Sequence, residues 1–126
     1  MVVQNKLIRD LPFEKRCEII KDLNNKYSDR IPLYIMSGDN KKKSAKLLVP
    51  YDLSIMDVLY ILKKRVDIRS EESLYLYIHV YCNSNSNKIK EYIYCNTSET
   101  ISELYNKYKD DDNMLYMSYH LENTFG

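Results

Sequence analysis

The sequence contains little glycine and no tryptophan, and Gly38 and Gly126 are its two glycines among 126 residues. Phosphate-binding loops need several glycines close together, so a nucleotide-binding loop of that kind is excluded. Long apolar runs are also missing, since none approaches the roughly 20 residues that a membrane-spanning helix requires. If the protein acts at a membrane, another chemical feature must attach it there.

The net charge is small as well. The 19 basic and 18 acidic side chains leave a formal charge of +1, which argues against a nucleic-acid-binding protein that depends on overall charge. Basic clusters at Lys41–Lys43 and Lys63–Arg65 and an acidic run at Asp110–Asp112 are typical of solvated surfaces. A weak attraction of the basic clusters to anionic lipid would assist a covalent anchor without replacing it.

Cysteine is scarce and has no paired spacing. Cys17, Cys82 and Cys95 are odd in number and follow no signal-like N-terminus, which favours a reducing compartment. His79 lies three positions before Cys82, but a structural zinc site needs further paired ligands, and Cys95 is distant. The sequence offers no Ser/His/Asp arrangement either, so we expect no metal ion, no catalytic residue and no enzymatic activity.

A helical extension is predicted at the N-terminus, over residues 1–30. Phe13, Cys17 and Ile20 recur at helical spacing and are predicted to face the core, after a short helix in the first ten residues. Ile19 and Leu23 form a second apolar ridge beside that stripe. A helix with two apolar faces must be covered on both.

Strands and helices alternate in the remainder. Apolar runs predict strands at 31–36 and 46–51. Because proline cannot donate to a ladder, Pro50 places the second strand at a sheet edge or at its end. Ser54 is a good cap for a helix that ends at Arg65. An edge strand is available for pairing with another chain.

A hairpin follows this helix. Residues 73–82 alternate strictly between apolar and polar or aromatic side chains. One predicted face carries Leu74, Leu76, Ile78, Val80 and Cys82, and the other carries Tyr75, Tyr77, His79 and Tyr81. Residues 89–95 return as an antiparallel partner across a polar turn, which keeps Cys82 far from Cys95.

A helix within 96–112 and a last strand at 114–120 complete the chain. The order β, β, α, β, β, α, β after a helical extension predicts the α+β class and a ubiquitin-like β-grasp. Residues 31–122 are the expected core and 123–126 a flexible tail.

Several segments resemble one known family in family order. They are "PFEKR" (12–16), "KYSDRIP" (26–32), "LLVPYDL" (47–53), "LKKRVDIRSEESLYLYI" (62–78), "ELYNKYKDDDNMLYMSY" (103–119) and the terminal "FG". The chain is similar to the autophagy ubiquitin-like modifiers, the family of GABA-receptor-associated protein and microtubule-associated light chain three. The resemblance implies a β-grasp with two N-terminal helices. The hairpin between about residues 81 and 96 is longer than the family pattern, which predicts an elongated hairpin.

The resemblance also implies covalent attachment to a lipid. The carboxylate of Gly126 would be passed by an activating and a conjugating enzyme to the amine of phosphatidylethanolamine, with Phe125 as a recognition handle for these enzymes and for a delipidating cysteine protease. A residue without Cβ can thread a narrow enzyme site. No other cofactor is expected. Many family members carry residues beyond this glycine, and here the sequence stops at it, as in a chain ready for conjugation or one that was trimmed.

The family recruits receptors through a short motif, an aromatic residue and an aliphatic one three positions later. Such a peptide would add to the edge strand 46–50 and place alternate side chains in two pockets. The pocket for the aromatic residue would be lined by Ile19, Leu23, Pro32, Lys46, Leu48 and Met114. The pocket for the aliphatic residue would be lined by Tyr34, Val49, Pro50, Leu53, Val58, Ile61, Leu62 and Arg65. Leu47 would belong to the same groove. Arg30, Lys46 and Arg65 would attract acidic neighbours of the motif.

The expected protein is therefore a monomer in the cytoplasm and, after lipidation, on autophagosomal membranes, with no nucleic acid as partner. The sequence has 13 tyrosines, a single alanine and frequent Asn, Lys and Ile, whose codons are AT-rich, and this bias hints at a protist genome. A plastid-derived organelle of a parasitic protist is therefore another membrane that the resemblance allows. The alternative function is a β-grasp adaptor in membrane trafficking that binds peptides and is never conjugated. Both functions imply the same groove, and the Gly126 carboxylate distinguishes them.

Overall fold

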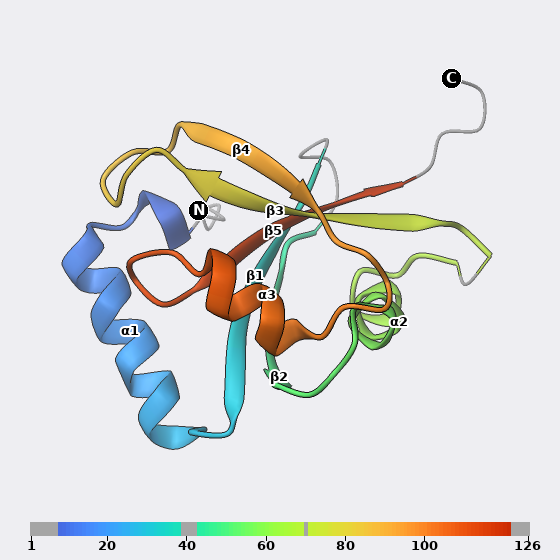
Figure 1. Ribbon diagram of the computed structural model, residues 1–126, viewed down its shortest axis with the longest axis horizontal. Coiled ribbons are helices and arrows are strands. Elements are labelled where there is room, and N and C mark those ends of the chain that lie inside the picture. Colours follow the sequence, from blue (N-terminus) through green and yellow to red (C-terminus); the bar gives the residue numbers. More distant parts are fainter. Residues whose placement is uncertain (1–7, 39–42, 70, 122–126) are drawn as a thin grey trace, which may run out of the picture.

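The computed structural model describes residues 8–38, 43–69 and 71–121 (Figure 1). Its elements in chain order are η1 (Ile8–Asp10, a 3₁₀ turn), α1 (Phe13–Lys26), β1 (Arg30–Ser37), β2 (Ala45–Pro50), α2 (Ile55–Arg65), β3 (Leu74–Tyr81), β4 (Ile89–Tyr94), α3 (Ile101–Tyr108) and β5 (Leu115–Leu121). The predicted tail at 123–126, with Phe125 and Gly126, lies outside the described residues.

The strands form one mixed sheet in the order β2-β1-β5-β3-β4. The central strands β1 and β5 run parallel, with Ile35 opposite Met117, and the other neighbouring strands pair antiparallel. This topology is the ubiquitin-like β-grasp that the sequence predicts. The predicted edge position of β2 is confirmed.

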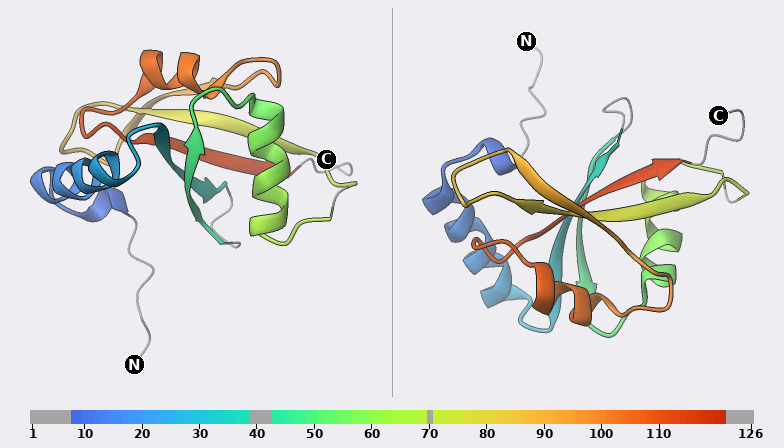
Figure 2. Two further views of the ribbon diagram at one scale, coloured as in Figure 1. Left: turned by 90° about the horizontal axis from the view of Figure 1, so that it is seen from below. Right: turned by 45° about the horizontal axis from the view of Figure 1, so that its top comes forward.

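The main core lies between the sheet and helices α2 and α3 (Figure 2). Ile55, Val58 and Leu62 from α2 and Ile101 from α3 have no exposed surface. Both helices begin with a capping box, as predicted at Ser54, whose Oγ accepts from the Asp57 amide at 3.2 Å. Local sequence therefore fixes where these helices begin, and their apolar faces fix how they pack.

A smaller apolar cluster covers the opposite face of the sheet, under η1 and α1. It consists of Ile8, Ile20, Tyr34, Met36, Met114 and Tyr116. The prediction that Phe13 and Cys17 face the core together with Ile20 was wrong in part, because both are half-buried and Arg16 is buried instead. Compared with the prediction, the helix is rotated so that the Arg16 guanidinium faces the buried carboxylate of Asp112. With an apolar stripe on this side, that carboxylate would lack its counterion.

Strand β3 departs from its predicted alternation at its end. Leu74, Leu76 and Ile78 are buried as expected, but Cys82 is exposed, since the pairing register shifts between Val80 and Tyr81. The three cysteines are free thiols. In the described part of the chain, no helix is long and apolar enough to cross a membrane, and no cluster of three His, Cys, Asp or Glu side chains could hold a metal ion.

His79 is buried although it lies on the polar face of β3. Its ring packs edge-on against Tyr92 at 5.0 Å and Tyr81 at 6.1 Å between ring centres, and neither ring nitrogen has a hydrogen-bond partner within the protein. Burial, followed by the nearby charge of His120, lowers the pKa of His79 from 6.5 to about 4. The folded protein therefore holds this imidazole neutral.

We expect His79 to destabilise the fold as pH falls. Because its pKa is lower in the folded than in the unfolded chain, the unfolded chain binds more protons between pH 6.5 and about 4. The stability contributed by the neutral ring is complete above pH 6.5 and falls by roughly 3 kcal/mol at the acid end, at about 1.4 kcal/mol per pKa unit. The measurement is urea unfolding of the wild type and His79→Leu at a series of pH values, where the variant should show the shallower loss.

The control for this titration is His120→Gln. It removes the smaller cause of the pKa change and leaves the burial of His79, so most of the loss in acid should remain. Parallel pH profiles for the wild type and His79→Leu would contradict a neutral buried imidazole.

Candidate peptide-binding groove

A groove of about 520 Å³ lies between α1, the edge strand β2 and the start of β5. It is lined by Ile8, Leu11, Ile19, Leu23, Pro32, Leu33, Lys46, Leu47, Leu48, Arg65 and Met114. Every residue that the sequence predicts for the aromatic pocket is in this set. Ile8, Leu11 and Leu33 were not predicted, because nothing in their local pattern shows which surface they meet.

Two elements supply most of the groove through their periodicity. On α1, Ile19 and Leu23 are half-buried one turn apart, to one side of the buried Ile20. On β2, Lys46 and Leu48 point away from the main core, whereas Leu47 is buried in it. The alternation of β2 therefore directs every second side chain toward the groove.

The edge of β2 gives the groove a backbone component. Among the described residues, β2 pairs only with β1, so its other side is open to an added strand. Arg30 Nη1 lies 3.4 Å from the Leu48 carbonyl oxygen as a long hydrogen bond at this edge. Arg30, Lys46 and Arg65 are exposed here, which gives the mouth of the groove a positive charge.

The residues predicted for the aliphatic pocket are brought together only in part. Val49, Val58 and Leu62 are buried in the main core, and Leu53 and Ile61 pack over them half-exposed. Leu53 and Ile61 therefore present more surface to a ligand than Val49, Val58 and Leu62 do. Pro50 is half-buried at the end of β2, and Arg65 belongs to the groove of the aromatic pocket.

Tyr34 is separated from this set. Its neighbours Leu33 and Ile35 point into the main core, so Tyr34 points to the opposite face, where its ring meets Tyr116 edge-on at 6.2 Å. The predicted position of Tyr34 in the aliphatic pocket was wrong, because the period of a strand places it on the α1 side.

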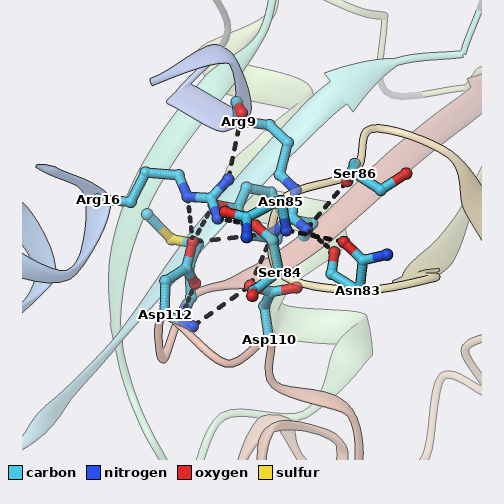
Figure 3. Close-up of polar contacts among 10 residues, drawn as sticks. Arg9, Arg16, Asn83, Ser84, Asn85, Ser86, Asp110 and Asp112 are labelled. Atoms are coloured by element: carbon cyan, nitrogen blue, oxygen red, sulfur yellow. Dashed lines mark hydrogen bonds and ion pairs between the residues drawn. The ribbon is translucent and has the colours of Figure 1, made fainter. Parts of the chain in front are cut away.

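A buried ionic cluster is formed by two arginines and two aspartates (Figure 3). It lies next to Met114, which lines the groove. Arg9 Nη1 lies 2.6 Å from Asp110 Oδ2, and Arg16 Nε lies 3.1 Å from Asp112 Oδ2. Asp112 also accepts from the Tyr116 hydroxyl at 2.5 Å and from the Met114 amide at 2.8 Å. The prediction that the acidic run 110–112 is a solvated surface was therefore wrong for Asp112, which is 1% exposed.

The charges of this cluster cancel, but its groups have little contact with water. Burial raises the pKa of Asp112, against the hydrogen bonds from Tyr116 and Met114, which lower it. Burial likewise raises the pKa of Tyr116, and its hydrogen bond to Asp112 raises it further, so the hydroxyl stays a donor. Two guanidinium groups and two carboxylates cancel in charge, and they fix the start of β5 next to Met114 in the groove.

The fold combines a mixed sheet packed against α2, two N-terminal helical segments on the other face, and a groove beside an edge strand. These features define a ubiquitin-like protein with an open groove at its sheet edge. A family model described as "Autophagy protein Atg8 ubiquitin like" matches residues 15–126. The chain belongs to this family, the Atg8 ubiquitin-like proteins of autophagy.

Alignments with individual relatives cover nearly the full length of both chains. Autophagy-related protein 8 of Dictyostelium discoideum is 33% identical over 133 residues, covering 100% of this chain and 98% of the relative. The protein of the same name from Coccidioides immitis is 29% identical over 128 residues, covering 98% and 99%. The crystal structure of Trypanosoma brucei ATG8 superposes with a TM-score of 0.75 at 28% identity, covering 98% of this chain and 100% of that one.

Proposed function

We propose that this protein is a modifier joined through the Gly126 carboxylate to phosphatidylethanolamine, and that it recruits aromatic-x-x-aliphatic receptors to the modified membrane. The observation that carries the proposal is the groove of about 520 Å³ beside the open edge of β2, in a chain of the Atg8 family. An extended peptide can pair with β2 and place its aromatic side chain between α1 and β2.

The partners follow from this chemistry. Activating and conjugating enzymes would carry the Gly126 acyl group, a cysteine protease would release it, and receptors would bring acidic residues to Arg30, Lys46 and Arg65. The membrane would be autophagosomal. A plastid-derived organelle is the second destination that we consider.

The lipid is tested by intact-mass analysis of the cellular protein. We expect the mass of a phospholipid on the chain and, after treatment with phospholipase D, the mass of ethanolamine alone, both located at Gly126. An unmodified terminus in starved cells would favour the adaptor that binds peptides without conjugation.

We expect Lys46→Glu combined with Leu48→Ala to weaken binding of an acidic Trp-x-x-Leu peptide by about tenfold or more. Truncating Leu48 removes apolar contact worth about 1 kcal/mol, and reversing the charge of Lys46 repels the acidic flank by up to about 1 kcal/mol. Fluorescence anisotropy of a labelled peptide measures the change.

The matched control places the same kinds of change on β4, the opposite edge of the sheet. Lys90→Glu with Ile89→Ala alters an exposed lysine and a half-buried aliphatic residue there. Its affinity should equal that of the wild type. Equal affinities for the wild type and the Lys46/Leu48 variant would show that the peptide does not bind in this groove.

A further inference from the structure

The connection between β3 and β4 lies against η1 and the start of α1 (Figures 1 and 2). The amide of Cys82 donates to the Lys88 carbonyl at 3.0 Å, so residues 83–87 form the tip of the hairpin beyond this pair. This tip contacts η1 and the first turn of α1, more than sixty positions away in the sequence. Asn87 Nδ2, for example, donates to Asp10 Oδ1 at 2.9 Å.

Arg9 makes the principal link between the two segments. Its side chain is buried, and Nη2 donates to the carbonyls of Asn83 at 2.7 Å and Ser86 at 3.1 Å. The guanidinium carbon lies 4.0 Å from the centre of the Tyr81 ring at the end of β3. Arg9 is thus bound by the hairpin through its tip and through the strand that leads to it.

Arg16 adds a second link and connects the tip to the groove. It donates to the Ser84 carbonyl and, at 3.2 Å, to the carbonyl of Arg9, while its Nε faces Asp112. Asp112 in turn holds the amide of Met114, whose side chain lines the groove. The hairpin tip, both arginines and Asp112 therefore form one continuous set of contacts (Figure 3), and the Met114 amide extends it to the groove.

The residues on either side of Arg9 line the groove. Ile8 is 5% exposed and Leu11 is half-buried, and both face the space between α1 and β2. η1 has three residues, and so short a helix is not stable by itself. Its position depends on the contacts that Arg9 and Ile8 make.

We propose that the β3–β4 tip, through Arg9 and Arg16, holds the segment Ile8–Leu11 as one wall of the peptide-binding groove and thereby determines which aromatic side chains the groove prefers. The inference rests on the proposed peptide binding. It gives the elongated hairpin a function that the position of the groove alone would not show. Arg9 and Arg16 are positioning residues, since they touch the wall and not the peptide.

The test compares Arg9→Gln with a variant in which residues 83–87 are replaced by Asn-Gly, a pair that closes a two-residue hairpin. Both remove the bonds between Arg9 and the tip carbonyls. We expect each to lower the affinity for a Trp-x-x-Leu peptide by about tenfold and to affect a Phe-x-x-Leu peptide less, because the smaller ring reaches the wall less. The combined variant should lose no more than either single one, since both act on the same contact.

Asn85→Ser is the matched control, because it changes a tip side chain and keeps the carbonyls that accept from the arginines. It should bind both peptides as the wild type does. Hydrogen exchange of the Leu11 amide, which donates to Ile8 at 3.1 Å, supplies a readout without peptide and should accelerate in Arg9→Gln and in the short hairpin.

Unchanged exchange at Leu11 in both variants would overturn the proposal, as would an equal loss for the Trp and Phe peptides or additive losses in the combined variant. A wild-type protein that binds neither peptide would overturn the proposed peptide binding. In that case the exchange at Leu11 still decides whether the tip holds the segment.

Discussion

Replacing Gly126 by alanine is expected to abolish attachment of the protein to phosphatidylethanolamine and its transfer to membranes. The proposed reaction passes an acyl group through two enzyme sites, and a glycine can follow an extended path through a narrow site that a Cβ would obstruct. Without the lipid, a chain of formal charge +1 has only weak attraction to anionic membranes. Membrane fractions and the intact mass of the protein, from starved cells, measure the two effects.

Asn123→Ala is the control for this substitution, because it alters the same tail and leaves the acyl donor unchanged. It should be lipidated as the wild type is. A phospholipid on Gly126→Ala, or equal membrane association of the two variants, would exclude conjugation through this residue. The groove variant with Lys46→Glu and Leu48→Ala should still be lipidated, so attachment and peptide binding are separable.

The fold could be predicted because its signals are local. Helix α2 is specified by the capping box at Ser54 and by apolar residues at helical spacing, and its observed end at Arg65 is the predicted one. Pro50 indicated the edge strand, and β2 is at the edge. The residues of the aromatic pocket came from the resemblance together with the second apolar ridge of α1, at Ile19 and Leu23.

The contacts behind the groove could not be predicted, since they join residues that are distant in the sequence. Arg9 and the Asn83 carbonyl are 74 positions apart, and the acceptor is a backbone atom that any residue type would supply. Arg16 and Asp112 resemble ordinary surface charges in their own segments, yet both are buried. Burial of a charged side chain depends on its partner, and the sequence does not state which partner is opposite.

The largest loss of stability is expected for Asp112→Ala. This carboxylate is the counterion of buried Arg16 and the acceptor for the Met114 amide and the Tyr116 hydroxyl. Its removal leaves a buried guanidinium without its nearest counterion and two donors without an acceptor. Breaking a buried ion pair from one side costs about 3–5 kcal/mol. Urea unfolding at pH 7, with fluorescence of the tyrosines as the signal, measures the difference.

Asp111→Ala distinguishes burial from charge, because Asp111 carries the same charge in the same loop and is exposed. Its effect should stay within about 0.5 kcal/mol, the usual range for a surface substitution. Asp112→Asn should fall between the two, since an amide oxygen can still accept from Met114 but cannot balance Arg16. A loss below about 1 kcal/mol for Asp112→Ala would mean that water or Asp110 replaces the carboxylate, and that Arg16 does not depend on this pairing.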